Sequence, residues 1–285
     1  MVVVSLTTSP KRIMQCWPCL QSLLEQTLKP ELIVFNLPHK YGRTGEKYVI
    51  PIQVRRSVHV NRCDRDWGPA TKIVPTISFL RKRGFSENTR IIYLDDDMLY
   101  PSNMFETFCS LSSECVWALN GLSMPTSKDI TELEKEIGVE LWQAGPVAAP
   151  LFVDKVWQNP VQTGTPVDIV EAYGGICTTL SMFKDDFLPF MRRAMGCNMR
   201  KYAADVTLSN YFAKQGISRR LVYSDVLWWG HIRPLPWGLN EQDALQNGGA
   251  LSETNLSRYL RLIPSLEAQN DYYFGSSRSM QCLQD

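Results

Sequence analysis

The sequence predicts an α/β fold, with a mostly parallel central sheet flanked by helices, from two observations. Strand-like and helix-like stretches alternate along the first hundred residues, an order typical of parallel strands joined by helices. The chain has 285 residues, of which 44% are hydrophobic, so it can bury a sizeable core. Because no repeat, low-complexity segment or linker interrupts the pattern, we expect a single domain over residues 1–285.

In the first half, β-branched and apolar runs predict four strands, and apolar residues at helical spacing predict two helices between them. The strands are expected at 2–8, 29–38, 50–57 and 89–97, and the helices at 16–28 and 68–84. Polar residues follow two of these strands, in VSLTTSPKR and YLDDD. Since ligands bind at the carboxyl ends of strands in such sheets, these two ends are the expected site.

After Pro101 the pattern becomes more mixed. Strands are expected at 114–122 and 218–223, a strand–glycine turn–strand unit at 167–183, and helices at 101–112, 185–195, 203–216 and 255–266. Ser102 is the expected cap at the start of the first of these helices, and Gly216 is expected to end the third. Residues 123–170 carry many polar residues, glycines and prolines, so we expect them to form a variable lobe.

Composition excludes several classes of protein. The 30 Lys and Arg residues nearly balance 29 Asp and Glu residues, which gives no support for nucleic-acid binding. No run approaches 18 apolar residues, so no membrane span is expected, and the four-residue apolar start reads as a strand rather than a signal peptide. We interpret the eight cysteines, including the Cys16–Cys19 pair, as packing thiols of a reducing compartment, which predicts a cytoplasmic location.

The stretch IIYLDDDMLYP, from Ile91 to Pro101, carries three adjacent carboxylates after four apolar residues. In an extended segment side chains alternate, so Asp95 and Asp97 are expected to face one way and Asp96 the other. Two carboxylates on one side suit Mg²⁺ or Mn²⁺, which prefer oxygen ligands. The plain alternative is a solvated acidic turn.

Four segments together resemble a known family. VSLTTSPKRI, DWGPATKIVP, IIYLDDDMLYP and AADVTLSNYFAKQGI are similar, in order and spacing, to glycosyltransferase domains of the GT-A fold. The nearest resemblance is to such domains in large DNA viruses of algae, the chloroviruses, and in their bacterial relatives. It spans roughly residues 1–225, and the acidic triplet stands where the family has its D-x-D motif.

The resemblance implies a reaction, a metal cofactor and separate regions for binding the donor and the acceptor. Residues 1–120 would bind a nucleotide-diphosphate sugar, in the first place a UDP-sugar, and residues 121–285 would bind the acceptor. A hexosyl, deoxyhexosyl or pentosyl group would pass to a hydroxyl of a glycan or glycoprotein with inversion, using Mn²⁺ or Mg²⁺. A viral protein would do this in the host cytoplasm.

The resemblance also implies roles for particular residues, each with a plainer alternative. The donor-binding positions, apart from a glycine pair, are Thr7, Thr8, Arg12, Asp66, Lys72, Asp95 and Asp96, and the metal positions are Asp95, Asp97 and His231. Lys72 would meet the diphosphate, and Asp66 the base or ribose. The alternatives are a helix cap for the TTSPKR segment, a solvated helix lysine for Lys72 and a packed histidine for His231.

Asp205 and the Gly174–Gly175 pair complete the predicted site. Asp205 matches an acidic residue that deprotonates the acceptor hydroxyl in inverting members, although many members have two acids where this chain has Ala204–Asp205. Its alternative role is to cap the helix that it opens. The two glycines would let backbone approach the donor sugar, or would simply form a β-turn. Trp228, Trp229 and Trp237 could offer a sugar platform, although burial is the plainer interpretation.

Three other classes compete with a glycosyltransferase. A phosphatase of the haloacid-dehalogenase type also uses Asp-x-Asp after a strand, but near the chain start and with Thr or Val next, whereas Met98 follows here. A nucleotidyltransferase would need a glycine-rich basic loop after the first strand, and TTSPKR has no glycine. A non-catalytic carbohydrate- or nucleotide-binding protein would keep the fold without needing Asp205.

Overall fold

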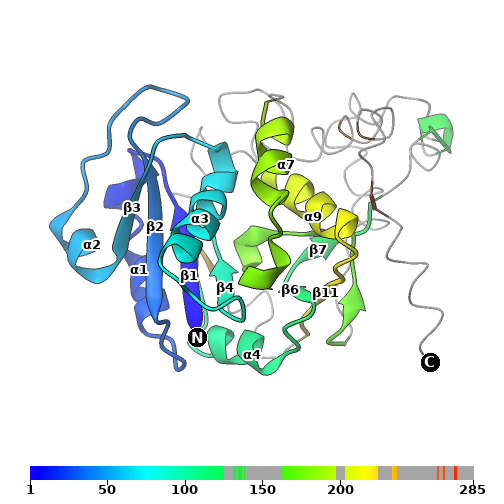
Figure 1. Cartoon of the computed structure of the whole chain (residues 1–285), viewed down its shortest axis with the longest axis horizontal. Coiled ribbons are helices and arrows are strands. Elements are labelled where there is room, and N and C mark those ends of the chain that lie inside the picture. Colours follow the sequence, from blue (N-terminus) through cyan, green and yellow to red (C-terminus); the bar gives the residue numbers. More distant parts are fainter. Residues whose placement is uncertain are drawn as a thin grey trace.

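The structure is a computed structural model that describes residues 1–124, 131–132, 134–136, 138, 162–196, 203–223, 233–235, 262, 266 and 273–274. Its largest element is an eight-stranded sheet in the order β3-β2-β1-β4-β10-β6-β11-β8 (Figure 1). The strands are β1 (Val2–Thr7), β2 (Leu32–Pro38), β3 (His59–Cys63), β4 (Arg90–Tyr93), β6 (Val116–Ala118), β8 (Thr165–Pro166), β10 (Ile176–Thr179) and β11 (Arg219–Leu221).

The sheet is mostly parallel, as predicted. Strands β3, β2, β1 and β4 run parallel to one another, and β11 runs parallel to β6. Strand β10 is antiparallel to both of its neighbours, and β8 is antiparallel to β11. Two small sheets pair β5 (Met98–Leu99) with β12 (Arg233–Pro234) and β7 (Gly121–Leu122) with β9 (Ile169–Val170).

Helices cover both faces of the sheet. The helices are α1 (Trp17–Leu24), α2 (Ile52–Ser57), α3 (Val74–Lys82), α4 (Met104–Ser110), α7 (Phe187–Ala194) and α9 (Ala204–Lys214). One core cluster lies between the sheet and α3, α7 and α9, and a second between the sheet and α1, α2 and α4. The 3₁₀ turns are η1 (Arg12–Met14), η2 (Gly68–Lys72), η3 (Ala172–Gly174) and η4 (Leu180–Met182).

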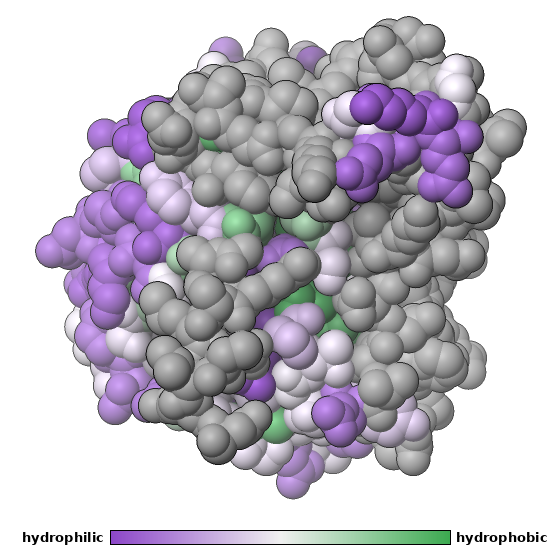
Figure 2. Space-filling view, turned by 90° about the vertical axis from the view of Figure 1, so that its right-hand side faces the viewer, coloured by the Kyte–Doolittle hydropathy of each residue, from purple (hydrophilic) through white to green (hydrophobic). Residues whose placement is uncertain are grey.

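The near-continuous apolar run of β1 follows from this layering. Val3 belongs to one core cluster and Val4 and Leu6 to the other, so both faces of the strand are buried. A parallel strand covered by helices on both sides needs apolar residues at nearly every position. On the face shown in Figure 2, the described surface is mainly hydrophilic, with a small hydrophobic area near its centre.

Most predicted elements are confirmed, and one is wrong. Residues 50–57 do not form a strand: they enter helix α2 after Pro51, and strand β3 begins only at His59. Pro51, with φ −59°, precedes the helix, and the alternation of Ile50, Ile52 and Val54 is misleading because Ile52 is 60% exposed. Proline fixes φ near the helical value and so favours the start of a helix.

Three other predictions need smaller corrections. Helix α4 begins at Met104 after Asn103, so Ser102 is not its cap. The helix expected at 68–84 divides at Ile73 into η2 and α3. Strand β4 ends at Tyr93, before the acidic triplet. Gly216 follows α9 with φ +69°, as expected of a glycine that ends a helix.

Some predictions fall outside the described residues. His231, Trp228, Trp229 and Trp237 are among them, as is most of the predicted lobe at 123–170. Of the helix expected at 255–266, only Leu262 and Leu266 are described, and both are helical and buried. In the described part of the chain, no helix has the length and apolar character required to cross a membrane.

Candidate active site

The candidate site lies where β1 and β4 end. The two strands are parallel neighbours, with Val4 opposite Ile92 and Ser5 opposite Tyr93. Their carboxyl ends therefore meet at one edge of the sheet, and the TTSPKR and DDD segments follow there side by side. This juxtaposition was predicted from the polar residues that follow each strand.

Thr8 and Arg12 bind the acidic triplet directly. The Thr8 hydroxyl donates a hydrogen bond to Asp96 Oδ2. Arg12 Nη2 lies 2.5 Å from Asp96 Oδ1 and 2.7 Å from Asp97 Oδ2, so one guanidinium serves two carboxylates. The alternation expected for the triplet is therefore wrong: Asp96 and Asp97 both face Arg12, because the strand has already ended and the triplet lies in a turn.

The three carboxylates differ in exposure. The Asp96 side chain is 7% exposed, whereas those of Asp97 and Asp95 are 21% and 33% exposed. Asp96 is thus enclosed by Thr8 and Arg12, and the two carboxylates accessible to a ligand are Asp95 and Asp97. The interpretation of the triplet as a solvated acidic turn is wrong, since all three side chains are partly or fully buried.

Lys72 reaches the triplet from the other side. Its ammonium Nζ forms a hydrogen-bonded ion pair with Asp95 Oδ1, and the residue is only 4% exposed. It is therefore not the solvated helix lysine of the plainer alternative. Burial lowers the pKa of Lys72, but the charges of Asp95 and Asp205 outweigh this effect, so the net shift of the pKa is upward and the ammonium stays charged.

A buried polar network beneath the site fixes the position of Lys72. The Ser5 hydroxyl lies within hydrogen-bonding distance of the Lys72 carbonyl and 2.6 Å from Thr76 Oγ1. The Asn36 side-chain amide donates to Thr76 Oγ1 at 2.8 Å and to Ser5 Oγ at 3.1 Å. These hydroxyls and amides join β1, β2, η2 and α3. Sequence reasoning missed this network, although its signal is visible: Ser5 and Asn36 interrupt otherwise apolar strands.

Asp205 lies in the first turn of α9, close to Lys72. Its Oδ2 atom accepts a hydrogen bond from the Ala172 backbone N–H at 3.2 Å. Oδ1 is buried and has no hydrogen-bond partner within the described residues. The capping interpretation is wrong, because Ala203 occupies the cap position and no side chain caps the helix. Burial raises the pKa of Asp205, the Lys72 charge opposes this, and the Asp95 charge adds to it.

The site has more negative than positive charge. Among the described residues, Asp95, Asp96, Asp97 and Asp205 have Arg12 and Lys72 as their cationic neighbours, so these six side chains in ionised form carry two uncompensated negative charges. The pKa values of the carboxyl groups reflect this excess of negative charge. Burial raises the pKa of Asp97 to about 7, with the Asp96 charge adding to the effect and Arg12 opposing it. Burial also raises the pKa of Asp96, against the influence of Arg12 and Thr8.

These residues fit a divalent cation. Carboxylate oxygens are the donors that Mg²⁺ and Mn²⁺ prefer, and two positive charges would balance the site. In the part of the chain that the structure describes, no three His, Cys, Asp or Glu side chains form a ready cage. Nucleotide-dependent sites commonly hold Mg²⁺ by one or two carboxylates together with phosphate oxygens, and Asp95 and Asp97 could supply these two.

Two tyrosines that sequence reasoning missed hold the loops of the site. Tyr100 Oη accepts from the Asp95 N–H at 3.1 Å and lies 3.1 Å from the carbonyls of Asp95 and Tyr173. It therefore links the triplet to η3. Tyr48 donates to the Thr8 carbonyl at 2.9 Å, which fixes the segment after β1. A lone tyrosine in a sequence carries no signal of such a contact.

Asp66 and Thr7 already have structural partners. Asp66 accepts from the backbone N–H groups of Gly42, at 2.5 Å, and Gly68, at 2.7 Å. It thus joins the loop after β2 to η2. The Thr7 hydroxyl donates to the Asn36 carbonyl at 2.8 Å. Contacts of these two residues with a donor remain predictions.

Gly174 and Gly175 are explained by close packing. A Cβ atom on Gly174 would lie 2.1 Å from Asn120 Oδ1, and one on Gly175 would lie 2.9 Å from Leu94 Cδ2. Gly175 also has φ +93°, which favours glycine. A side chain at Gly174 would displace the end of Asn120, and the positive φ of Gly175 independently favours glycine, so a contact with the donor sugar remains a prediction.

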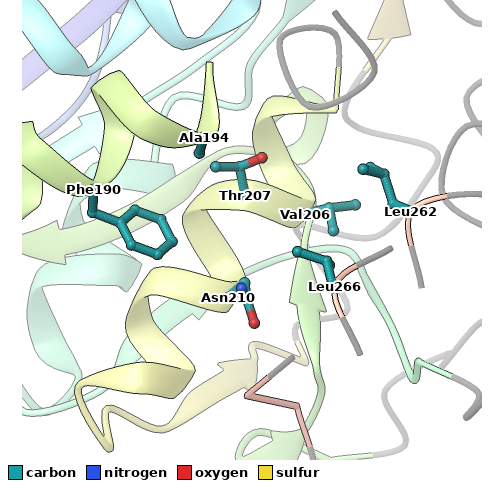
Figure 3. A pocket seen from close by; sticks show the side chains of 7 residues that line it. All are labelled: Phe190, Ala194, Val206, Thr207, Asn210, Leu262 and Leu266. Carbon is teal, nitrogen blue, oxygen red and sulfur yellow. The ribbon is translucent and has the colours of Figure 1, made fainter. Parts of the chain in front are cut away.

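A separate small pocket lies between α7, α9 and two residues of the C-terminal segment (Figure 3). Its lining is Phe190, Ala194, Val206, Thr207, Asn210, Leu262 and Leu266. None of the described residues that line it is ionisable, so they offer no acid, base or charged ligand contact. The charged site at the ends of β1 and β4 is the better candidate for chemistry.

Comparison with known proteins finds structural similarity only. No protein-family profile matches the chain, and no curated protein shows significant similarity to it. Among solved structures, 4-diphosphocytidyl-2C-methyl-D-erythritol synthase is 13% identical with a TM-score of 0.43, covering 85% of this chain and 94% of its own. Residues 1–349 of S. aureus TarS in complex with UDP are 12% identical with a TM-score of 0.43, covering 79% of this chain and 58% of that one.

A galactosyltransferase, LgtC, in complex with donor and acceptor sugar analogues, is 10% identical with a TM-score of 0.36, covering 79% of this chain and 74% of its own. Every TM-score of these three is below 0.5 and every identity below 25%. The similarities therefore identify neither a family nor a reaction for this chain, and a functional conclusion has to come from the site.

Proposed function

We propose that this protein is a metal-dependent glycosyltransferase that moves a sugar from a nucleotide-diphosphate sugar, in the first place a UDP-sugar, to a hydroxyl of a glycan acceptor. The observation that supports the proposal is the charge imbalance among the described residues of the site: four buried or partly buried carboxylates against two cations. A divalent cation would balance it, and Arg12 and Lys72 would then be available to diphosphate oxygens.

The roles proposed for the acidic triplet follow from exposure. Asp95 and Asp97, the two more exposed carboxylates, would hold Mn²⁺ or Mg²⁺, which when bound stabilises the negative charge of the departing diphosphate. Asp96 would keep Thr8 and Arg12 in place through the bonds described above. Lys72 would contact the diphosphate from a position that its buried network fixes in advance.

Asp205 is the proposed general base. Within the described residues its Oδ1 atom has no hydrogen-bond partner, and burial raises the pKa of the carboxyl, which favours the uptake of a proton. We propose that it removes the proton of the acceptor hydroxyl as that oxygen attacks the anomeric carbon. The diphosphate leaves from the opposite face in a single displacement, so the anomeric configuration inverts.

Donor binding tests the proposal. Titration calorimetry with UDP, GDP and CMP and their sugars, with Mn²⁺ and with excess chelator, is expected to show binding that needs the ion. Asp97→Asn is expected to remove the dependence on the ion. A ligand at 100 times its Kd stabilises a protein by about 2.7 kcal/mol, so thermal shifts provide a second readout. Equal affinity for UDP in chelator would refute the metal role.

The alternatives are less well supported by the site. A phosphatase with its nucleophile after the first strand would need a carboxylate there, whereas β1 is followed by Thr8 and Ser9 and the carboxylates follow β4. A non-catalytic binding protein would use the charged donor site but not Asp205. Turnover of a bound donor distinguishes it from an enzyme.

A further inference from the structure

Three large hydrophobic side chains are exposed on one layer of the molecule. Val49 is 78% exposed, and Met14 and Ile52 are each 60% exposed. Their chain neighbours point the other way, into the core cluster beneath α1, α2 and α4: Ile13, Tyr48 and Val54. The three exposed residues therefore lie on the outer side of that layer.

The stretch that carries Val49 and Ile52 is also basic. In α2, Ile52, Arg55 and Arg56 share one face, since residues three and four apart are neighbours on a helix, and all three are exposed. Lys47 is exposed just before Val49, and no acidic residue occurs from Lys47 to Ser57. Within the described residues, the side chains of Lys47, Arg55 and Arg56 have no hydrogen-bonded or ion-pair partner. We call Lys47, Val49, Ile52, Arg55 and Arg56, which lie within one stretch of ten residues, the basic-aliphatic patch.

The patch occupies an accessible corner of the fold. Figure 1 shows α2 as the outermost labelled helix at the β3 end of the sheet, with α3 between it and α7 and α9 in this view. Strand β3 is the edge strand at that end. An extended flat surface could therefore approach α2 without meeting another described element.

We propose that the basic-aliphatic patch docks the protein on an anionic lipid bilayer. The combination of side chains selects this partner: cations are attracted to anionic headgroups, while Val49 and Ile52 can enter the interface between headgroups and acyl chains. A nucleic acid or another polyanion would bind the cations but gain nothing from the two exposed apolar side chains of the patch. With so few inserted residues the attachment is reversible, and it does not depend on the proposed catalytic function.

Vesicle sedimentation with the full chain tests the proposal. Binding is expected to vesicles that contain phosphatidylserine, to fall with added salt, and to be weak on pure phosphatidylcholine. Each Lys or Arg near such a surface contributes about fivefold to partitioning, so Arg55→Gln with Arg56→Gln is expected to lower it by about 25-fold. Val49→Ser with Ile52→Ser is expected to lower it by about tenfold or more.

The chain offers matched controls. Arg192 and Arg193 form another exposed pair in the last turn of a helix, α7, in the other half of the molecule. Arg192→Gln with Arg193→Gln is expected to leave vesicle binding within twofold of the original. Tyr223→Ser, which removes an exposed aromatic side chain beyond β11, is likewise expected to have little effect. Melting curves establish that every variant is folded.

Three results would overturn the proposal. The first is no binding to anionic vesicles, and the second is an equal loss of binding in the α7 control pair. The third is that the Val49 and Ile52 substitutions leave vesicle binding unchanged while double-stranded DNA binds as tightly as the vesicles do. That outcome would make the patch a simple polyanion surface.

Discussion

Replacing Lys72 by methionine separates a buried functional cation from an ordinary surface lysine. Lys72 is 4% exposed, is hydrogen-bonded to Asp95 and lies near the carboxylate of Asp205. Methionine keeps most of the volume of the side chain but removes the charge. Two carboxylates then lose their compensating cation inside the protein.

The expected loss of stability is large. Breaking a buried ion pair by removing one partner costs about 3–5 kcal/mol, because an uncompensated charge stays behind. We therefore expect Lys72→Met to lower the free energy of unfolding by about 3–5 kcal/mol at pH 8. The loss should be smaller at pH 5: without Lys72 the folded-state pKa values of the carboxyls rise, so their protonated forms favour the fold at low pH and this contribution disappears as pH increases.

Urea unfolding at the two pH values measures this loss of stability, and a lysine variant in the neighbouring helix α3 serves as the control. Lys82→Met removes an exposed lysine from the last turn of α3 and is expected to change stability by less than about 0.5 kcal/mol. UDP binding to Lys72→Met should also weaken, by about 1.5–3 kcal/mol for one lost charge-assisted contact. A loss of stability below about 1 kcal/mol at both pH values would contradict the buried-pair reasoning.

Two further outcomes are expected. Burial raises the folded-state pKa of Asp97 to about 7, so ionisation of this carboxyl opposes folding above its ordinary pKa near 3.9 and does so fully above pH 7. Asp97→Asn should therefore raise the melting temperature at pH 8 and change it little at pH 4. A lower melting temperature at pH 8 would show that the Arg12 contact dominates. Gly174→Ala should lower the free energy of unfolding by about 1–3 kcal/mol, because the new Cβ would lie 2.1 Å from Asn120 Oδ1. The double variant with Asn120→Ala should lose less stability than the sum of the two single variants, and purely additive unfolding energies would refute this.

Sequence patterning predicted much of the sheet because its strands are buried on both faces. The short apolar runs of β1, β2 and β4 are typical of strands buried on both faces, and their order along the chain implies parallel pairing. Segment 50–57 was misread because three apolar residues at alternate positions look like a strand, while Pro51 and the exposure of Ile52 decide for a helix. The exposure of the Ile52 side chain depends on tertiary contacts, so it cannot be inferred from a pattern of three residues.

The residues that make up the candidate site were easier to predict than the hydrogen bonds and ion pairs between them. Thr8, Arg12, Lys72 and the acidic triplet do meet at one sheet edge. The pairing of Arg12 with two carboxylates could not be foreseen, because it depends on where β4 ends, and element ends are the least certain feature of a pattern. Tyr100 and Tyr48 were missed because single side chains that bond to distant backbone leave no periodic signal.

Turnover by the Asp205→Asn variant, alongside the unaltered protein, tests the central claim most directly. The measurement is release of the nucleoside diphosphate from the sugar donor that binding experiments identify, in the presence of a hydroxyl acceptor and Mn²⁺, with the product anomer assigned by NMR. We expect Asp205→Asn to bind the donor normally, to melt no earlier than the unaltered protein, and to turn over about 10²–10⁴-fold more slowly, with an inverted product anomer in the unaltered protein. Turnover near that of the unaltered protein would remove Asp205 as the base, and a retained anomeric configuration would contradict the single displacement.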